Sequence, residues 1–383
     1  MNKTWIGIIA IVILGIVVWG IASLGSQNTD TGTGPLKIGV ILPLTGDAAA
    51  YGEPLQNVTQ LATDEINAAG GVNGRPMQLI IEDGKCTGQD AANAAQKLVN
   101  VDKVQVIIGG FCSGESLAAE PVAAQAKVAM ISPGSSSPKL TGIGPYFVRN
   151  YPSDATQGTV LANIAYNDKG WKTVAVIQEQ TDYAAGIASV FSGAFSKLGG
   201  QAPIEQFPTE TNDFRSLLSK VKGENPDAVF VVVQTPAVGQ RIFTQMQQLG
   251  WTPHLLVSDI IPGDPDTVSK YSSLLNGTLA AEFGVDPTNP KFSGLLSSYK
   301  AKFGVDMPFQ SYGQTVYDSV YLVADAIKAV GYNGTKIANW LHTDVQNWQG
   351  AAGSVTIGSN GDPVTGHKPE VITGGKVEPY VKQ

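Results

Sequence analysis

Apolar residues fall in short runs along this chain, and longer amphipathic stretches separate the runs. The first run, within residues 36–45, is nearly continuous and is closed by Pro43 and the polar residues 45–47. A run without apolar–polar alternation is typical of a strand buried on both faces in the middle of a parallel sheet. The amphipathic stretch over residues 51–69 predicts a helix. Together they predict the opening of a βαβ unit, in which loops at the carboxyl ends of strands bind small ligands.

The same alternation continues to a loop at residues 132–138. The pattern predicts strands over 77–82, 104–108 and 128–131, and helices over 90–100 and 116–126. Pro121 lies in the last helix, so we expect it in the first turns or at a kink. Strands that alternate with helices of this length predict a parallel sheet with helices on both faces.

A second series begins near residue 152 and predicts a second doubly wound domain. It comprises helices over 156–168, 183–198, 213–222 and 240–249, and strands over 173–178, 228–233 and 255–258. A long helix over 312–330 and a hairpin over 370–381, turning at Gly374 and Gly375, come later. Because these late elements exceed what the second domain needs, we expect some of them to return to the first through several crossing segments.

Length and composition agree with two globular domains and exclude some functions. A chain of 383 residues is too long for one ordinary core. The net charge is −7 and no basic block occurs, which disfavours nucleic-acid binding because phosphate neutralisation needs clustered Lys and Arg. Three widely separated histidines make a His-based metal site improbable, and no cofactor or metal motif is present.

The N-terminus predicts export of everything that follows it. Residues 5–24 are uncharged, apolar and long enough to span a bilayer, with Lys3 before them and Asp30 as the first acid after them. Residues 1–24 are therefore a transmembrane anchor or a cleaved signal segment, and 25–35 form a flexible linker. Cys86 and Cys112 lie in the exported part, where an even count suggests one disulfide.

Two loops after predicted strands carry candidate ligand donors. Ser113 stands where a strand gives way to a helix, whose first turn offers unpaired N–H groups to a carboxylate. Ser113 or Ser116 could instead simply cap that helix, which is the interpretation that local sequence alone favours. The loop 132–138 is rich in serine between two prolines, and it is either a binding loop or an ordinary polar turn.

Other candidates come from the second series and from aromatic residues. Asp259 ends a buried strand and suits an ammonium group, although acids at such places also cap helices. Tyr51 and Tyr183 are predicted as exposed-loop aromatics ahead of helices, where they could cover the apolar part of a ligand. Core packing is the usual role of tyrosine.

An enzyme is the remote alternative. Residues 110–114 have the spacing of a strand-to-helix nucleophile elbow with Cys112 as the nucleophile. A cysteine hydrolase would need a thiolate and a histidine base, for which His254 and His342 are available. A disulfide between the two cysteines would abolish the nucleophile, so a free thiol would decide between the alternatives.

Five motifs together resemble one family: IGVILPLTGDAAAYGEP, DEINAAGGVNGRPMQLIIEDGKC, GGFCSGES, ISPGSSSP and RNYPSDATQG. The chain from residue 36 onward is similar to the leucine/isoleucine/valine-binding proteins, the type I periplasmic binding proteins of ATP-driven amino-acid importers. The resemblance implies an α/β fold with two doubly wound parallel-sheet lobes joined by three crossover segments. The first lobe would comprise 36–153 and 283–362, and the second 154–282 and 363–383.

The resemblance also assigns residues, position by position. It implies a Cys86–Cys112 disulfide and an ammonium contact from Asp259. The remaining ligand-binding residues would be Ser113, Gly134 and Ser136 on the carboxylate side, and Tyr51, Tyr183 and Gln234 around the ligand side chain. Gln234 stands where branched-chain receptors carry an aromatic, Asp259 is shorter than their glutamate, and Tyr183 is followed by Ala184 rather than Gly. These departures make the second lobe more polar and put branched-chain preference in doubt.

The function implied is that of an extracytoplasmic solute-binding protein, not an enzyme, that closes on an amino acid by hinge motion and delivers it to ABC transporter permease subunits. We expect a monomer without a cofactor, attached to the membrane through its N-terminal segment or released after cleavage. A ligand-binding sensory ectodomain, or a receptor for an amide, urea or an aromatic acid, are the alternatives.

Overall fold

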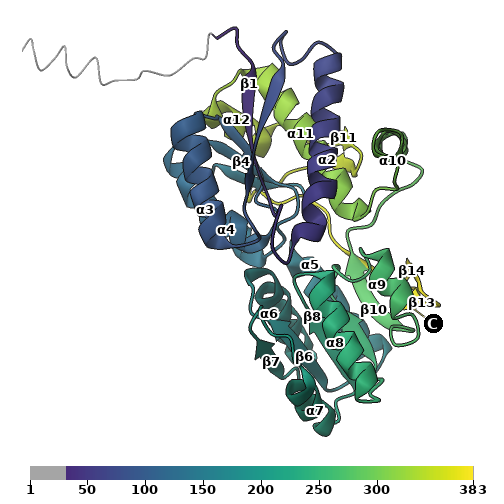
Figure 1. Cartoon of the computed structure of the whole chain (residues 1–383). Coiled ribbons are helices and arrows are strands. Elements are labelled where there is room, and N and C mark those ends of the chain that lie inside the picture. Colours follow the sequence, from purple (N-terminus) through teal and green to yellow (C-terminus); the bar gives the residue numbers. More distant parts are fainter. Residues whose placement is uncertain (1–31, 383) are drawn as a thin grey trace, which may run out of the picture.

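The computed structural model describes residues 32–382, which form two lobes stacked end to end (Figure 1). The predicted anchor or signal segment lies outside the described residues. Within 32–382, no helix combines the length and the apolar composition needed to cross a bilayer.

The first lobe is built on a five-stranded sheet in the order β2-β1-β3-β4-β5, with every neighbouring pair parallel. β1 lies between two strands, and only Lys37 of its seven residues is exposed. The prediction of a central strand buried on both faces is therefore confirmed. The strands are β1 (Leu36–Leu42), β2 (Met77–Asp83), β3 (Val106–Ile108), β4 (Ala129–Ser132) and β5 (Phe147–Arg149).

Helices from both ends of the chain cover this sheet. The early ones are α2 (Ala49–Ala68), α3 (Gly88–Lys97) and α4 (Ser113–Gln125), and the late ones are α10 (Pro290–Phe303), α11 (Gln310–Val330) and α12 (Gly334–Thr343). α11 packs against α2, and its Val320 and Val323 share one apolar core with Ile38 of β1. The late helices therefore return to the first sheet, as the surplus of late elements predicted.

The second lobe is built on a seven-stranded sheet in the order β14-β13-β10-β9-β8-β6-β7. Its strands are β6 (Val174–Glu179), β7 (Ile204–Phe207), β8 (Ala228–Val232), β9 (Leu255–Val257), β10 (Thr278–Glu282), β13 (Lys368–Thr373) and β14 (Lys376–Pro379). Its helices are α5 (Asp154–Asn163), α6 (Asp182–Lys197), α7 (Arg215–Gly223), α8 (Pro236–Gln248) and α9 (Pro265–Lys270). β13 and β14 are the predicted hairpin, and both turn residues, Gly374 and Gly375, have the positive φ that a two-residue turn favours.

Three segments connect the lobes: one after β5, one after β10 and one before β13. The last of these follows the short hairpin of β11 (Trp348–Gly350) and β12 (Gly353–Val355). Fully buried Arg149, at the end of β5, donates to Asp362 of this third segment at 2.6 Å. This ion pair connects the first and third crossover segments. The residue limits proposed for the two lobes stay predictions.

The pattern misses β5, β7, β10, α9, α10 and α12. Most of these elements are short; α10 is longer, and its buried Phe292, Leu295 and Tyr299 have helical spacing, but they are its only buried residues. The helix predicted from residue 116 begins at Ser113, so Pro121 lies inside α4 rather than in its first turns. The expectation of Pro121 in the first turns is therefore wrong, and the alternative of a kink stays a prediction.

Candidate functional site

Loops at the carboxyl ends of both sheets face each other between the lobes. Lys139 of the first lobe forms an ion pair with Asp182 of α6 at 2.8 Å. Gly186 of α6 lies so close to Pro138 that a Cβ there would be 2.8 Å from the proline Cδ. The lobes are thus in contact, and the candidate site lies where these loops meet.

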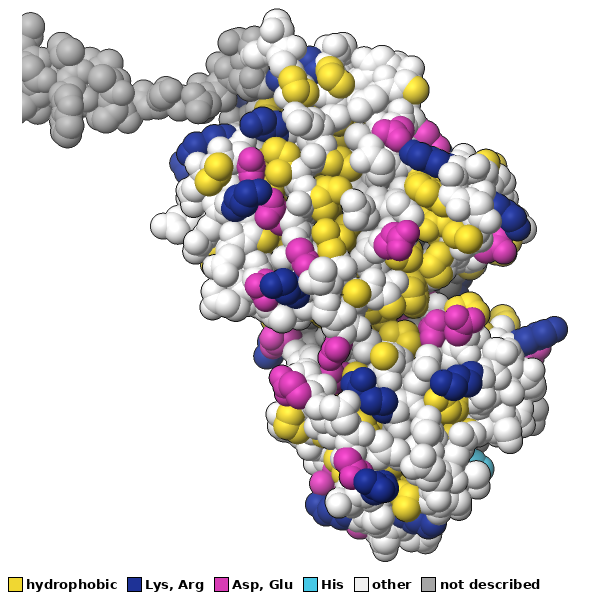
Figure 2. Space-filling view, in the orientation of Figure 1, with side chains coloured by type: hydrophobic (Ala, Val, Ile, Leu, Met, Phe, Trp, Pro, Cys, Tyr) yellow, Lys and Arg dark blue, Asp and Glu magenta, His cyan; other side chains and the backbone are white. Residues whose placement is uncertain are grey.

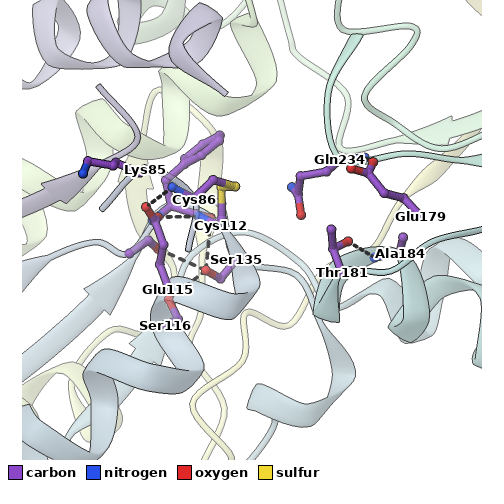
Figure 3. Close-up of a disulfide and its surroundings, with 12 residues drawn as sticks. Lys85, Cys86, Cys112, Glu115, Ser116, Ser135, Glu179, Thr181, Ala184 and Gln234 are labelled. Carbon is purple, nitrogen blue, oxygen red and sulfur yellow. Dashed lines mark hydrogen bonds between the residues drawn. A yellow bond between two sulfur atoms is a disulfide. The ribbon is translucent and has the colours of Figure 1, made fainter. Parts of the chain in front are cut away.

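A disulfide and a buried acid fix the first-lobe loops (Figure 3). Cys86 is bonded to Cys112, as predicted, so neither sulfur is a thiol and the hydrolase hypothesis loses its nucleophile. The Glu115 carboxylate accepts N–H bonds from Cys86, Phe111 and Cys112, each at 2.9 Å. Burial raises the pKa of Glu115 to about 7, although these three bonds oppose the shift. Glu115 therefore joins the loops after β2 and β3.

Serine hydroxyls connect the two predicted binding loops. The Ser116 Oγ lies 2.7 Å from the Ser135 Oγ, and Ser132 donates to the Gly110 carbonyl at 2.7 Å. Ser113 Oγ accepts the Ser137 N–H at 3.1 Å. The N-cap position of α4 belongs to Cys112, so the capping alternative for Ser113 and Ser116 is wrong.

The loop 132–138 also presents hydroxyls that have no protein partner. The Oγ atoms of Ser136 and Ser137 are buried and unpaired within residues 32–382. Gly134 packs under the Phe111 ring, where a Cβ would lie 2.4 Å from a ring carbon. Glycine at this position therefore lets the backbone approach the Phe111 ring, while the Ser137 hydroxyl lies against Gly186 of α6 and the Ser136 hydroxyl lies beside Asp154.

Tyr51 and Tyr183 are not the exposed-loop residues that the sequence predicts. Both are buried in the first turns of helices, because each continues the apolar stripe of its helix. The Tyr51 ring lies 5.2 Å from that of Phe111 and 4.6 Å from that of Phe309. Its hydroxyl is buried without a partner among the described residues.

Asp259 is fully buried and is surrounded by phenols. Tyr151 donates to its carboxylate at 2.8 Å, Tyr312 at 2.7 Å, and Tyr183 donates to the other oxygen. Burial, reinforced by the negative charge of Asp259, raises the pKa of all three phenols well above the ordinary value. The phenols therefore remain protonated donors. Tyr151 lies in the first crossover and Tyr312 on α11, and the sequence patterns gave neither a ligand-site role.

Asp154, the first residue of α5, is the second acid at the site. It is fully buried and its carboxylate makes no hydrogen bond of regular geometry within the described residues, but it lies beside the Ser136 hydroxyl, which acts to lower its pKa. Burial raises its pKa well above the ordinary value, and the charge of Asp259 adds to this shift. The side chain of Ser153 already caps α5, so Asp154 is not needed as the cap. An acid directly after a capping serine is the sequence signal that could have identified Asp154 as a site residue.

The two basic side chains near Asp154 and Asp259 are Arg149, which is already hydrogen-bonded, and His367, which is uncharged. The Arg149 guanidinium donates to Asp362, to Thr141 and to the carbonyls of Ser135 and Ser137. Burial lowers the pKa of His367 to about 4, so its ring is uncharged at neutral pH. A cationic group from outside the protein would therefore find two carboxylates to bind.

Gln234 approaches from the second lobe. Its side chain points toward the disulfide across the gap in Figure 3. The backbone N–H of Gln234 donates to Glu179 at 2.6 Å, and burial raises the pKa of that carboxyl to about 7. This wall of the site is polar.

The site thus combines serine hydroxyls with two carboxylates, one of which, Asp154, lies beside Ser136, and this combination suits a small molecule that carries both an acid and an amine. No cluster of His, Cys, Asp or Glu able to hold a metal ion occurs within residues 32–382. The structure brings Ser113, Ser136, Tyr51, Tyr183, Gln234 and Asp259 to the lobe junction, with Gly134 beneath them, and adds Asp154, Tyr151 and Tyr312.

Comparison with known proteins gives a consistent match. Residues 35–367 match a family model described as periplasmic binding protein. A leucine binding protein from Thermotoga maritima is 30% identical, with a TM-score of 0.82, over 90% of this chain and 98% of its own. A branched-chain amino acid transporter substrate-binding protein from Streptococcus pneumoniae, solved with isoleucine, is 28% identical, with a TM-score of 0.80, over 91% and 100%. A solute binding protein of an ABC transporter from Rhodopseudomonas palustris, solved with 3,4-dihydroxybenzoic acid, is 25% identical, with a TM-score of 0.76, over 88% and 93%.

Proposed function

The chain belongs to the periplasmic binding protein family and has its type I fold, and on this premise we propose that it is the extracytoplasmic receptor of an ABC importer for an amino acid. The observation that carries the proposal is the pair of buried acids, Asp154 and Asp259, neither of which forms an ion pair within the described residues. A buried carboxylate without a countercharge is costly even where hydroxyls donate to it, and a ligand ammonium group supplies the countercharge.

Each end of the zwitterion has its own part of the site in this proposal. The ligand carboxylate binds Ser113, Ser136 and the backbone near Gly134, together with the N–H groups at the start of α4. The ammonium lies between Asp259 and Asp154. Tyr51, Tyr183 and Gln234 border the ligand side chain, so a small or polar side chain fits the second lobe better than a large apolar one.

A thermal-shift screen of the full chain against amino acids, amides and aromatic acids tests this proposal. We expect stabilisation by amino acids that carry free α-amino and α-carboxylate groups, and no shift by their N-acetyl or amide derivatives. Asp259→Asn should abolish the shift. Asp213→Asn is the matched control, because Asp213 is an exposed acid far along the second lobe. An equal response of N-acetyl derivatives would contradict the ammonium assignment.

An aromatic acid is the second candidate ligand, favoured by the stacked rings of Tyr151 and Tyr312, 4.8 Å apart, and by the relative solved with 3,4-dihydroxybenzoic acid. Such a ligand has no ammonium group, so Asp259→Asn would not weaken its binding. The same pair of measurements therefore separates the two candidates.

Delivery to permease subunits, a monomeric state and attachment through residues 5–24 complete the proposal. Cell fractionation followed by N-terminal sequencing distinguishes an anchored chain from a cleaved one, and light scattering gives the oligomeric state. Transport requires binding to a permease. Binding to a histidine kinase instead would favour the sensory ectodomain.

A further inference from the structure

A second cavity lies within the first lobe, away from the junction of the lobes. It has a volume of about 320 Å³, is open to solvent on one side, and is lined by α2, α10, α11 and the start of β11. Figure 2 shows hydrophobic side chains gathered between α2 and α10 on this face. The residues that define it are Glu65, Lys291, Leu295, Tyr317, Tyr321 and Trp348.

An acid is held in the wall of this cavity by two phenols. Tyr317 donates to the Glu65 carboxylate at 2.5 Å and Tyr321 donates to the same oxygen at 2.9 Å. The two tyrosine rings lie 4.9 Å apart, one helical turn from each other on α11. Burial, and secondarily Glu65 itself, raises the pKa of Tyr317, so the phenol keeps its proton and remains a donor to Glu65.

Glu65 has no basic partner among residues 32–382, whereas the other charges of the wall are satisfied. Asp318 accepts the N–H groups of Ala351 and Ala352 at 2.6 and 2.9 Å. Lys291 donates to a carbonyl of β11, at Gln349, rather than to Glu65. The Lys291 ammonium also lines the cavity, but it is held at the Gln349 carbonyl and the Trp348 ring, so a cationic ligand would still find Glu65 without a countercharge.

The indole ring of Trp348, the third aromatic ring of the cavity, already lies next to a cation. The Lys291 ammonium lies 5.3 Å from the centre of the Trp348 ring, and the indole N–H donates to Asp325 at 2.9 Å, which fixes the ring. Aromatic rings around a carboxylate bind alkylated ammonium groups through the ring faces, and the volume is that of a small-molecule site. A bare metal ion would find only one carboxylate free to coordinate it.

We propose that the cavity formed by Glu65, Tyr317, Tyr321 and Trp348 is a second small-molecule site that binds a compact organic ammonium ion. The charged nitrogen lies against Glu65 and its alkyl groups contact the three rings. The site shares no residue with the site between the lobes, so its occupation is independent of the ligand proposed there.

Calorimetric titration of the full chain with choline tests the proposal. Its uncharged carbon isostere, 3,3-dimethylbutan-1-ol, is the matched ligand control, because it has the same shape and no charge. We expect choline to bind on the order of tenfold more tightly than the isostere. Glu65→Gln should remove that advantage, and Lys291→Met, which frees the Trp348 face, should tighten choline binding several-fold.

Asp259→Asn is the control for the other site and should leave choline binding unchanged. Loss of choline binding in Asp259→Asn would place choline between the lobes and overturn the proposal. Equal affinity for choline and its isostere, or no heat with either ligand, would also overturn it. If Glu65→Gln does not fold, the Lys291→Met titration and the isostere still decide the question, since both use the intact carboxylate.

Discussion

The two halves of the site between the lobes differ in how they are held. The first-lobe half, called the neutral half because serine hydroxyls rather than acids line it, is held mainly by its own groups: the Cys86–Cys112 bond, Glu115 and the hydroxyls of Ser116 and Ser135 connect its loops to one another. The second-lobe half is charged. Its carboxylate, Asp259, receives one phenol from its own lobe, one from a crossover and one from α11 of the first lobe.

This difference separates a preformed part of the site from a part that closure assembles. The serine loops are held mainly by bonds within the first lobe, and the second lobe adds one hydrogen bond, from the Asp154 N–H to the Ser136 carbonyl at 2.9 Å. Asp259 loses the Tyr312 donor whenever the lobes separate, because that phenol belongs to α11. Closure therefore changes the surroundings of the acid more than those of the hydroxyls, and a ligand ammonium that binds the acid favours the closed arrangement.

The largest effect is expected from removing the charge of Asp259. Asp259→Asn should weaken amino-acid binding by about 3 kcal/mol, roughly 150-fold, because the ligand ammonium loses a buried countercharge. Isothermal titration calorimetry with the amino acid found in the thermal-shift screen measures the change. Unchanged affinity would show that Asp259 does not bind the ligand, and the distinction between a neutral and a charged half of the site would then fail.

Next in size is the effect of the disulfide, which belongs to the neutral half. Replacing Cys86 and Cys112 together by serine should lower the free energy of unfolding by about 3 kcal/mol, because the bond constrains the unfolded chain over a separation of 26 residues. Urea denaturation of the oxidised protein and the double variant measures it. A loss that appears only in ligand affinity, at constant stability, would mean that the bond positions the loops without stabilising the fold.

Asp154 should contribute less than Asp259 but in the same direction. Asp154→Asn is expected to weaken binding by about 2 kcal/mol, roughly 30-fold, since the remaining acid still holds the ammonium. The raised pKa of Asp154 adds a pH signature, because the ammonium favours the ionised form. Binding to the native chain should therefore release protons and tighten as the pH rises, and Asp154→Asn should reduce both effects.

Single hydroxyls of the neutral half should have smaller effects. Ser136→Ala should cost about 1 kcal/mol, or fivefold in affinity, as expected for one hydrogen bond to a charged ligand. Ser137→Ala is the matched control, because its Oγ faces Gly186 of α6 rather than the proposed carboxylate. Equal losses for the two variants would indicate a general disturbance of the loop.

The smallest effect concerns an acid at the second-lobe end of the third crossover. Burial raises the pKa of Glu370 to about 7, and one of its oxygens has no partner within the described chain. The folded state therefore binds a proton that the unfolded state releases, so this group lowers stability as pH rises from about 4.5 to 7. Glu370→Gln should raise the free energy of unfolding by about 1 kcal/mol at pH 8 and leave it unchanged at pH 4. Thermal unfolding at both pH values checks the sign.

The sequence predicted the repeated strand–helix alternation because buried parallel strands such as β1 leave near-continuous apolar runs. It missed β5 and β7, which are too short for a period, and α10, whose outer face is polar. The returning late helices were expected only as surplus elements. Their placement on α2 depends on contacts between residues about 250 positions apart, such as that between Tyr317 and Glu65, which no local pattern contains.

The candidate site was predicted best where family motifs were dense. Ser113, Ser136 and Asp259 meet at the lobe junction, but their roles remain proposals. Tyr151 and Tyr312 were missed because a tyrosine in a crossover or at a helix start has no distinctive spacing. Asp154 was missed because an acid after a serine cap is ordinary at a helix start, and only its burial without a partner distinguishes it.

A crystal structure of the chain with the amino acid that stabilises it most tests the central claim most directly. The account predicts the ligand ammonium in contact with both Asp259 and Asp154, and the carboxylate on Ser113 and Ser136. A ligand bound between the lobes with its carboxylate toward Asp259, or with no atom near either acid, would contradict it.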